Sequence, residues 1–141
     1  MAANLDDAST FEDHEAIKKL KARYFRLMDT KRWDEFGEVF AGDAYFVHPE
    51  TNQPTVRGKR AIVERVRGFV KDAVTVHHGF MPEIELTSAT TATAIWSMSD
   101  IIDDGTRVSE GHGHYEETYV KSAGEWKIQS SKLTRLRHIT R

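Results

Sequence analysis

Two side chains in this sequence could together remove a proton from carbon. Asp29 closes the first long helical pattern, and His77 lies within a strand-like run from residue 74 to residue 86. An imidazole that is hydrogen-bonded to a carboxylate has a fixed tautomer and a raised basicity, which suits it to act as a general base at neutral pH. Asp29 and His77 are therefore a candidate catalytic pair, and Tyr24 is a third candidate because a phenol can donate a hydrogen bond to a developing charge.

A structural interpretation of the same residues is also open. Asp29 can cap the following helix, and His77 can be a hydrogen-bonded core histidine. Tyr24 and Asp29 are about 140° apart around an ideal helix, so they share a pocket only if its wall wraps round the helix end. Residue types and spacing alone do not decide between these roles.

Helical patterns dominate the first half of the chain. Ser9 and Glu12 have the spacing of a capping box, and the apolar residues after them predict a helix over about 10–29. These apolar residues are Ile17, Leu20, Tyr24, Leu27 and Met28. A second stripe predicts a short helix that ends at Gly42, a residue suited to the left-handed conformation after a helix end. Its members are Trp33, Phe36, Val39 and Phe40.

The remaining pattern is mostly that of strands. Residues 44–48 predict a short strand ended by Pro49, and a third helical pattern runs from Gly58 to Phe69. Four period-two runs then predict long strands at 74–86, 90–102, 107–121 and 125–137. Asp104-Gly105 indicates a tight two-residue hairpin, because both central positions of that turn need positive φ, and residues 122–124 indicate a looser one. Helices followed by strands favour an α+β fold with a curved antiparallel sheet, whose concavity is the natural ligand site.

Composition narrows the class of protein. A length of 141 residues fits one domain, which we expect over residues 10–141 after a disordered stretch at 1–9. The formal net charge of −2 argues against nucleic acid and anionic membranes as partners. The sequence has no cysteine, no secretory signal pattern and no long apolar run, so we expect a cytoplasmic protein.

Four segments of the sequence carry a resemblance to a known family. They are Tyr24-Phe-Arg-Leu-Met-Asp29 with Trp33 and Phe36 after it, Thr75-Val-His77-His-Gly79, Gly111-His-Gly-His-Tyr115 and Gly124-Glu-Trp126-Lys. In order and spacing they resemble the SnoaL-like branch of the nuclear-transport-factor-2-like (NTF2-like) superfamily. Within it the chain looks closest to the group of scytalone dehydratase, bile-acid 7α-dehydratase and hexachlorocyclohexane dehydrochlorinase. The resemblance implies a cone-shaped α+β barrel in which three N-terminal helices pack on a strongly curved antiparallel sheet around a pocket.

The resemblance also implies roles for particular residues. Asp29 and His77 match the catalytic aspartate and histidine of the family, and Tyr24 matches a tyrosine of bile-acid dehydratase. Asp100 falls where that enzyme has a pocket aspartate, and His48 falls where both dehydratases carry a pocket tyrosine. Two positions depart from the pattern, since Met28 replaces a tyrosine of scytalone dehydratase and Ser131 replaces an arginine of the dehydrochlorinase.

The function implied is that of a cofactor-independent dehydratase or isomerase. Its substrate would be a small hydrophobic cyclic carbonyl compound, steroid-like or of the polyketide or aromatic type. The apolar strand residues expected in its binding pocket are Phe46, Met81, Trp96, Met98 and Tyr115. A cation is expected from Arg135 or Arg137, and the pattern does not say which of the two points inward. The closest enzymes imply a homo-oligomer, a trimer or alternatively a dimer.

Two rival interpretations use the same residues differently. His112, His114 and Glu117 resemble the metal-binding pattern of cupins, but residues two apart on a strand can equally place His112 and His114 on the outer sheet face, with Tyr115 and Glu117 inside. His78, next to His77, should also point outward. We expect no metal and no organic cofactor. The rival from another class is a non-catalytic domain that binds a small molecule in the same pocket.

Overall fold

A computed structural model of the chain describes residues 8–141. The helices are α1 (Ala8–Asp29), α2 (Trp33–Gly37) and α3 (Lys59–Val70). The strands are β1 (Phe40–Val47), β2 (Pro54–Arg57), β3 (Val74–Leu86), β4 (Thr91–Asp103), β5 (Val108–Ser122) and β6 (Glu125–Thr140). No helix in this range is both long enough and apolar enough to cross a membrane.

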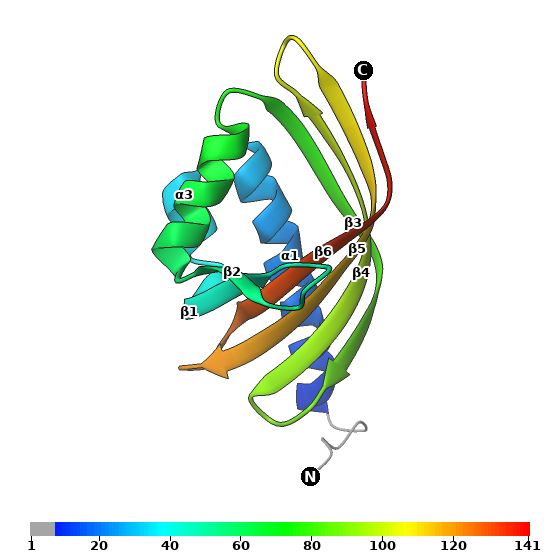
Figure 1. Cartoon of the computed structure of the whole chain (residues 1–141). Helices are drawn as coiled ribbons and strands as arrows, with labels where there is room; N and C mark the ends of the chain where they lie inside the picture. Colours follow the sequence, from blue (N-terminus) through cyan, green and yellow to red (C-terminus); the bar gives the residue numbers. More distant parts are fainter. Residues whose placement is uncertain (1–7) are drawn as a thin grey trace.

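The strands form one curved sheet in the order β2-β1-β6-β5-β4-β3, which leaves β2 and β3 as its edges. Helices α1 and α3 lie on its concave side (Figure 1). The expected antiparallel barrel needs correction on two points, because β1 pairs with β6 in parallel and the sheet is not closed. The direction of β1 depends on a long-range pairing with the last strand, which local patterns do not report.

The N-terminal helix packs through the predicted stripe. Its apolar face is buried in the core, with Ile17 and Leu27 fully covered and Tyr24 only 5% exposed. The helix already includes Ala8 and Ser9, so Ser9 is not the N-cap that the capping-box pattern predicts. The rest of the segment expected to be disordered, residues 1–7, lies outside the described residues.

The second predicted helix is shorter than expected. It ends at Gly37, and Phe40 and Gly42 belong to strand β1. Gly42 does not take the left-handed conformation that a helix end would ask of it. All four stripe residues still pack as predicted, since Phe36, Val39 and Phe40 are buried and Trp33 packs against them, with Phe36 edge-on to Phe40 at 5.3 Å. The short strand β2 was not predicted.

The two long hairpins exchange the turn types expected of them. Of Asp104 and Gly105 only the glycine has positive φ, because the Asp104 carboxylate accepts hydrogen bonds from the backbone of Thr106 and Arg107 and closes a wider loop. The tight hairpin is the later one. Ala123 (φ 51°) and Gly124 (φ 78°) lie between paired strand ends and provide the two positive-φ positions of a two-residue turn.

Alternation along the strands sorts residues between the faces as predicted. Tyr115 and Glu117 are buried on the inner face, whereas His112 and His78 are exposed on the outer one. The alternation breaks at bulges, including one opposite residues 112 and 113 on β5. At that bulge the partner backbone crosses so closely that a Cβ on Gly113 would lie 1.9 Å from the carbonyl oxygen of Thr134.

Gly113→Ala therefore tests the packing that bends the sheet. We expect it to lower the free energy of unfolding by about 3 kcal/mol, because the added methyl meets backbone that cannot rotate away. Gly42→Ala is the matched control, since a Cβ there would meet no atom within 4 Å. Urea denaturation measures both variants, and equal stability of the two would contradict this description of the bend.

Candidate functional site

A cavity of about 580 Å³ lies between α3, the β1–β2 connection and the concave face of the sheet. Its wall includes most of the residues expected at the site, namely Tyr24, Phe46, His48, His77, Asp100, Tyr115 and Arg135. Val66, Phe69 and Leu133 add apolar surface. An apolar wall with a few convergent polar groups is the usual composition of a small-molecule site.

His77 and Asp29 are in direct contact. The Nδ1 atom of His77 lies 2.7 Å from Oδ1 of Asp29, and the backbone N–H of His77 donates to Oδ2 at 2.8 Å. An ionised carboxylate only accepts hydrogen bonds, so Nδ1 is the donor and the neutral ring has its lone pair on Nε2. The His77 side chain is 6% exposed and lines the cavity, while Asp29 lies behind it. The structure therefore has the contact that a general base would need.

Asp29 is held by two further residues that the sequence analysis missed. Thr75 donates its hydroxyl to Oδ1 of Asp29 at 2.9 Å, and Lys31 donates to the Thr75 hydroxyl at 2.9 Å. Partial burial lowers the pKa of Lys31, and the charge of Asp29 opposes that shift. Thr75 could have been found, because residues two apart on a strand share a face and Thr75 precedes His77 by two.

A second carboxylate approaches His77 from the neighbouring strand. Asp100 is the register partner of His77, and its Oδ2 lies 3.9 Å from Nε2 of the imidazole. Its charge is balanced by Arg135, which donates from Nη1 and Nη2 at 3.2 Å and 2.9 Å. This bidentate pair places a cation and an anion beside the imidazole.

A bulge in the last strand determines which of its two arginines, Arg135 or Arg137, points into the cavity. Arg135 pairs in register with Gly113 and Arg137 with His112, so the bulge puts one extra residue between them and Arg137 shares the register position of the outer-face residue His112. Arg135 reaches Asp100 across the bare backbone of Gly111, where a Cβ would lie 1.7 Å from Nη1. Gly111 is therefore required by this ion pair.

Tyr24 reaches the cavity directly, whereas Asp29 acts on it only through His77. The angle of about 140° between Tyr24 and Asp29 around the helix is therefore no obstacle, because only Tyr24 has to face the cavity and Asp29 contacts His77 instead. Burial raises the pKa of Tyr24 above its ordinary value, and the charge of Glu117 raises it further, so the phenol keeps its proton as a donor. Phe25, next to Tyr24, stacks on the His77 ring with centroids 6.2 Å apart.

Three residues expected in the pocket wall are elsewhere, and those expectations need correction. Met81 is 89% exposed, because the β3 bulge next to it gives it a φ of 40° and turns it outward. Trp96 and Met98 are buried but do not line the cavity. Trp96 packs in the core, where its indole N–H donates to the Tyr119 hydroxyl at 2.9 Å.

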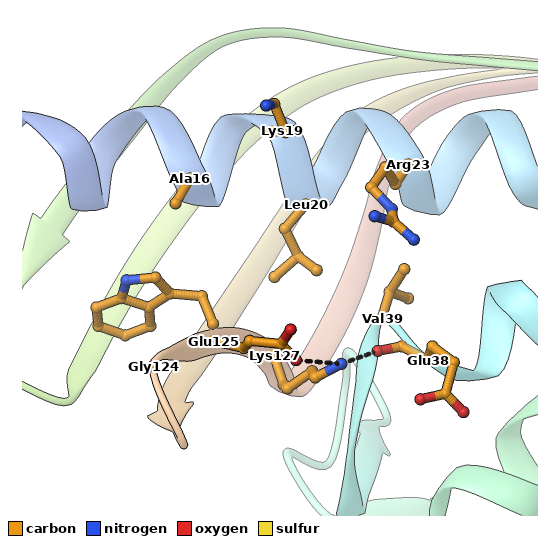
Figure 2. A pocket seen from close by; sticks show the side chains of 10 residues that line it. Ala16, Lys19, Leu20, Arg23, Glu38, Val39, Gly124, Glu125 and Lys127 are labelled. Atoms are coloured by element: carbon orange, nitrogen blue, oxygen red, sulfur yellow. Dashed lines mark hydrogen bonds and ion pairs between the residues drawn. The ribbon is translucent and has the colours of Figure 1, made fainter.

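A second hollow, of about 410 Å³, lies between α1, residues 38–39 and the start of β6. Figure 2 shows Lys127 reaching between the Glu125 carboxylate, with which it forms an ion pair, and the backbone oxygen of Glu38, to which it donates a hydrogen bond. None of the expected site residues lines it. Within residues 8–141 no three His, Asp or Glu side chains come close enough together to hold a metal ion.

Comparison with known proteins connects this architecture to a family. The sequence profile of the SnoaL-like domain matches residues 9–132. A probable cyclase of Gibberella zeae is 26% identical over 138 residues, which cover 85% of this chain and 89% of that protein.

Solved structures agree on the fold. A candidate scytalone dehydratase of Novosphingobium aromaticivorans superposes with a TM-score of 0.83 at 21% identity, covering 92% of this chain and 88% of the other. A type-3 hexachlorocyclohexane dehydrochlorinase of Novosphingobium barchaimii gives 0.81 at 16% identity, with coverage of 94% and 92%.

Alkaline titration tests the burial of the tyrosines. Burial raises the pKa of Tyr24, Tyr115 and Tyr119, so we expect these three to stay protonated in the native protein at a pH of about 11. In the unfolded chain they lose their protons near pH 10, where the unfolded state then binds fewer protons than the native one. Stability should therefore fall as the pH rises above about 10.

Ultraviolet absorbance of tyrosinate in native and denatured protein measures this difference. Ionisation of all four tyrosines near pH 10 in the native protein would contradict the burial described here.

Proposed function

Because this chain belongs to the SnoaL-like domain family, we propose that it is a cofactor-independent dehydratase or isomerase that acts on a small hydrophobic cyclic carbonyl compound. The observation that carries the proposal is the contact of 2.7 Å between His77 and Asp29 at the wall of a mainly apolar cavity. Relatives named as dehydratase, dehydrochlorinase and cyclase support a reaction of this type.

The first step would be removal of a proton from the carbon next to the carbonyl group. Nε2 of His77 is the atom that takes the proton, because Nδ1 is committed to Asp29. The imidazolium that forms is stabilised by the Asp29 carboxylate, and the Asp100 charge 3.9 Å from Nε2 adds to this stabilisation. The electrons of the broken C–H bond move to the carbonyl oxygen and give an enolate.

The enolate oxygen needs a hydrogen-bond donor, and Tyr24 or His48 is proposed for that role. In a dehydration the enolate then expels a β-hydroxyl group, which leaves as water with the proton held by His77 or with one from the donor. In an isomerisation His77 returns the proton to a different carbon. Both outcomes use only the groups already in the cavity, and a steroid-like or polyketide-type ring would suit its apolar lining.

The other residues of the cavity wall would bind the ring rather than react with it. Phe46 and Tyr115 offer flat surfaces, and Leu133 and Val66 add aliphatic ones. Arg135 would keep Asp100 in place and supply positive charge at that end of the cavity. A non-catalytic domain that binds the same class of molecule would need these contacts but not the His77–Asp29 pair.

Turnover by the variants His77→Ala and His78→Ala distinguishes the proposed enzyme from a non-catalytic binding domain. We expect wild-type protein to convert a hydroxy-ketone or hydroxy-steroid to the conjugated enone, and His77→Ala to lower kcat by about 10²- to 10⁴-fold, because the base is lost. His78→Ala is the matched control, since this neighbour is exposed on the opposite face. The absorbance of the enone follows the reaction.

Equal rates for wild type and His77→Ala would rule out the proposed base. Binding of the hydroxy-steroid without any turnover by wild type would favour the non-catalytic domain.

A further inference from the structure

A fully buried ion pair lies next to the cavity and has no part in the chemistry above. Nζ of Lys21 on α1 is 2.8 Å from Oε2 of Glu117 on β5, and both side chains are 0% exposed. Neither residue lines the cavity. An apolar replacement of a buried ion pair is often neutral or stabilising, so stability alone does not call for charges here.

Glu117 has a complete set of hydrogen-bond donors. Besides Lys21, its Oε2 accepts from the Ser131 hydroxyl at 2.7 Å, and its Oε1 accepts from the Tyr119 hydroxyl at 2.7 Å. The Tyr119 hydroxyl in turn accepts from Trp96. A network with all its members satisfied is rigid, so Glu117 is a fixed anchor for the ammonium group of Lys21.

Lys21 lies against the faces of two tyrosines that do line the cavity. Its Nζ is 3.8 Å from the ring centroid of Tyr24 and 3.7 Å from that of Tyr115. The two rings are edge-on to each other, with centroids 6.0 Å apart and an interplanar angle of 79°. A desolvated cation at this distance attracts both ring faces and restricts their rotation. Lys21 therefore supports both rings from behind the cavity wall.

We propose that Lys21, anchored by Glu117, is a positioning residue that holds Tyr24 and Tyr115 so that the Tyr24 hydroxyl, supported by that of Tyr115, binds an oxyanion. This inference rests on the proposed function and deepens it, because it names the atoms that receive the developing negative charge. The ligand class is a planar ring bearing an enolate or phenolate oxygen. Burial raises the pKa of both phenols, so both stay protonated, and because the Tyr115 hydroxyl donates to that of Tyr24, the Tyr24 proton is the one left for the ligand.

The experiment uses 4-nitrophenol as a probe, since its phenolate is a planar oxyanion whose absorbance reports binding. Lys21→Met alone would leave the Glu117 carboxylate buried without its cation and could unfold the protein. The double variant Lys21→Met/Glu117→Gln removes both charges together and avoids this. We expect the double variant to keep the wild-type Tm and to bind 4-nitrophenolate about 10- to 100-fold more weakly. Lys18→Met is the control, because Lys18 is half exposed on the same helix, and it should bind like wild type.

Tyr115→Phe provides a second arm that does not disturb the ion pair. It keeps the ring beneath Lys21 and removes one hydroxyl, so we expect a similar loss of affinity with little change in Tm. Wild-type affinity in either the double variant or Tyr115→Phe would overturn the inference, as would a wild-type protein that does not bind the phenolate.

Failure of the proposed function has a different signature. His77→Ala should lose turnover and keep probe binding, since the imidazole is not one of the oxyanion donors. If wild type binds the phenolate through Lys21-dependent tyrosines and turns over no hydroxy-ketone, the positioning role stands and the base chemistry fails.

Discussion

The hydrogen bond between Asp29 and His77 is the contact on which the organisation of the site depends. It joins the last residue of α1 to the edge strand β3, and the same carboxylate also accepts the backbone N–H of His77 and the hydroxyl of Thr75. Three donors on one carboxylate fix both the helix end and the imidazole, and the other ring nitrogen, 3.9 Å from the Asp100 carboxylate, is left at the cavity wall. One side chain thus ties the end of the helix to the strand that carries the imidazole.

Irregularities of the sheet place the other polar groups around that imidazole. Gly111 leaves the space through which Arg135 reaches Asp100, and the bulge beside Gly113 turns Arg137 away. Lys21, paired with Glu117, lies against the rings of Tyr24 and Tyr115. Arg135 and Asp100 at the cavity wall, and Lys21 and Glu117 behind it, are thus each paired with an opposite charge, so none of these buried charges is left uncompensated.

The sequence predicted those features that depend on local periodicity. The buried stripe of α1, the long strands and the inward direction of Tyr115 follow from helical and strand spacing, and the pairing of Asp29 with His77 was expected from the residue types and the family resemblance. Features that depend on a bulge or on distant pairing escaped it, as the outward turn of Met81 and the parallel pairing of β1 with β6 show. The sequence could also have predicted the buried ion pair of Lys21, because a lysine that lies between Ile17 and Tyr24 on the apolar stripe is buried and must be paired. The homo-oligomer and the cytoplasmic location stay predictions.

The tautomer of His77 tests the central claim most directly, because it depends on nothing but the contact with Asp29. Nuclear magnetic resonance of protein labelled with ¹⁵N-histidine distinguishes a proton on Nδ1 from one on Nε2. The structure predicts a strongly deshielded, slowly exchanging proton on Nδ1, and the loss of that signal in Asp29→Asn. A proton on Nε2 and none on Nδ1 in the wild-type protein, or a signal that Asp29→Asn leaves unchanged, would contradict it.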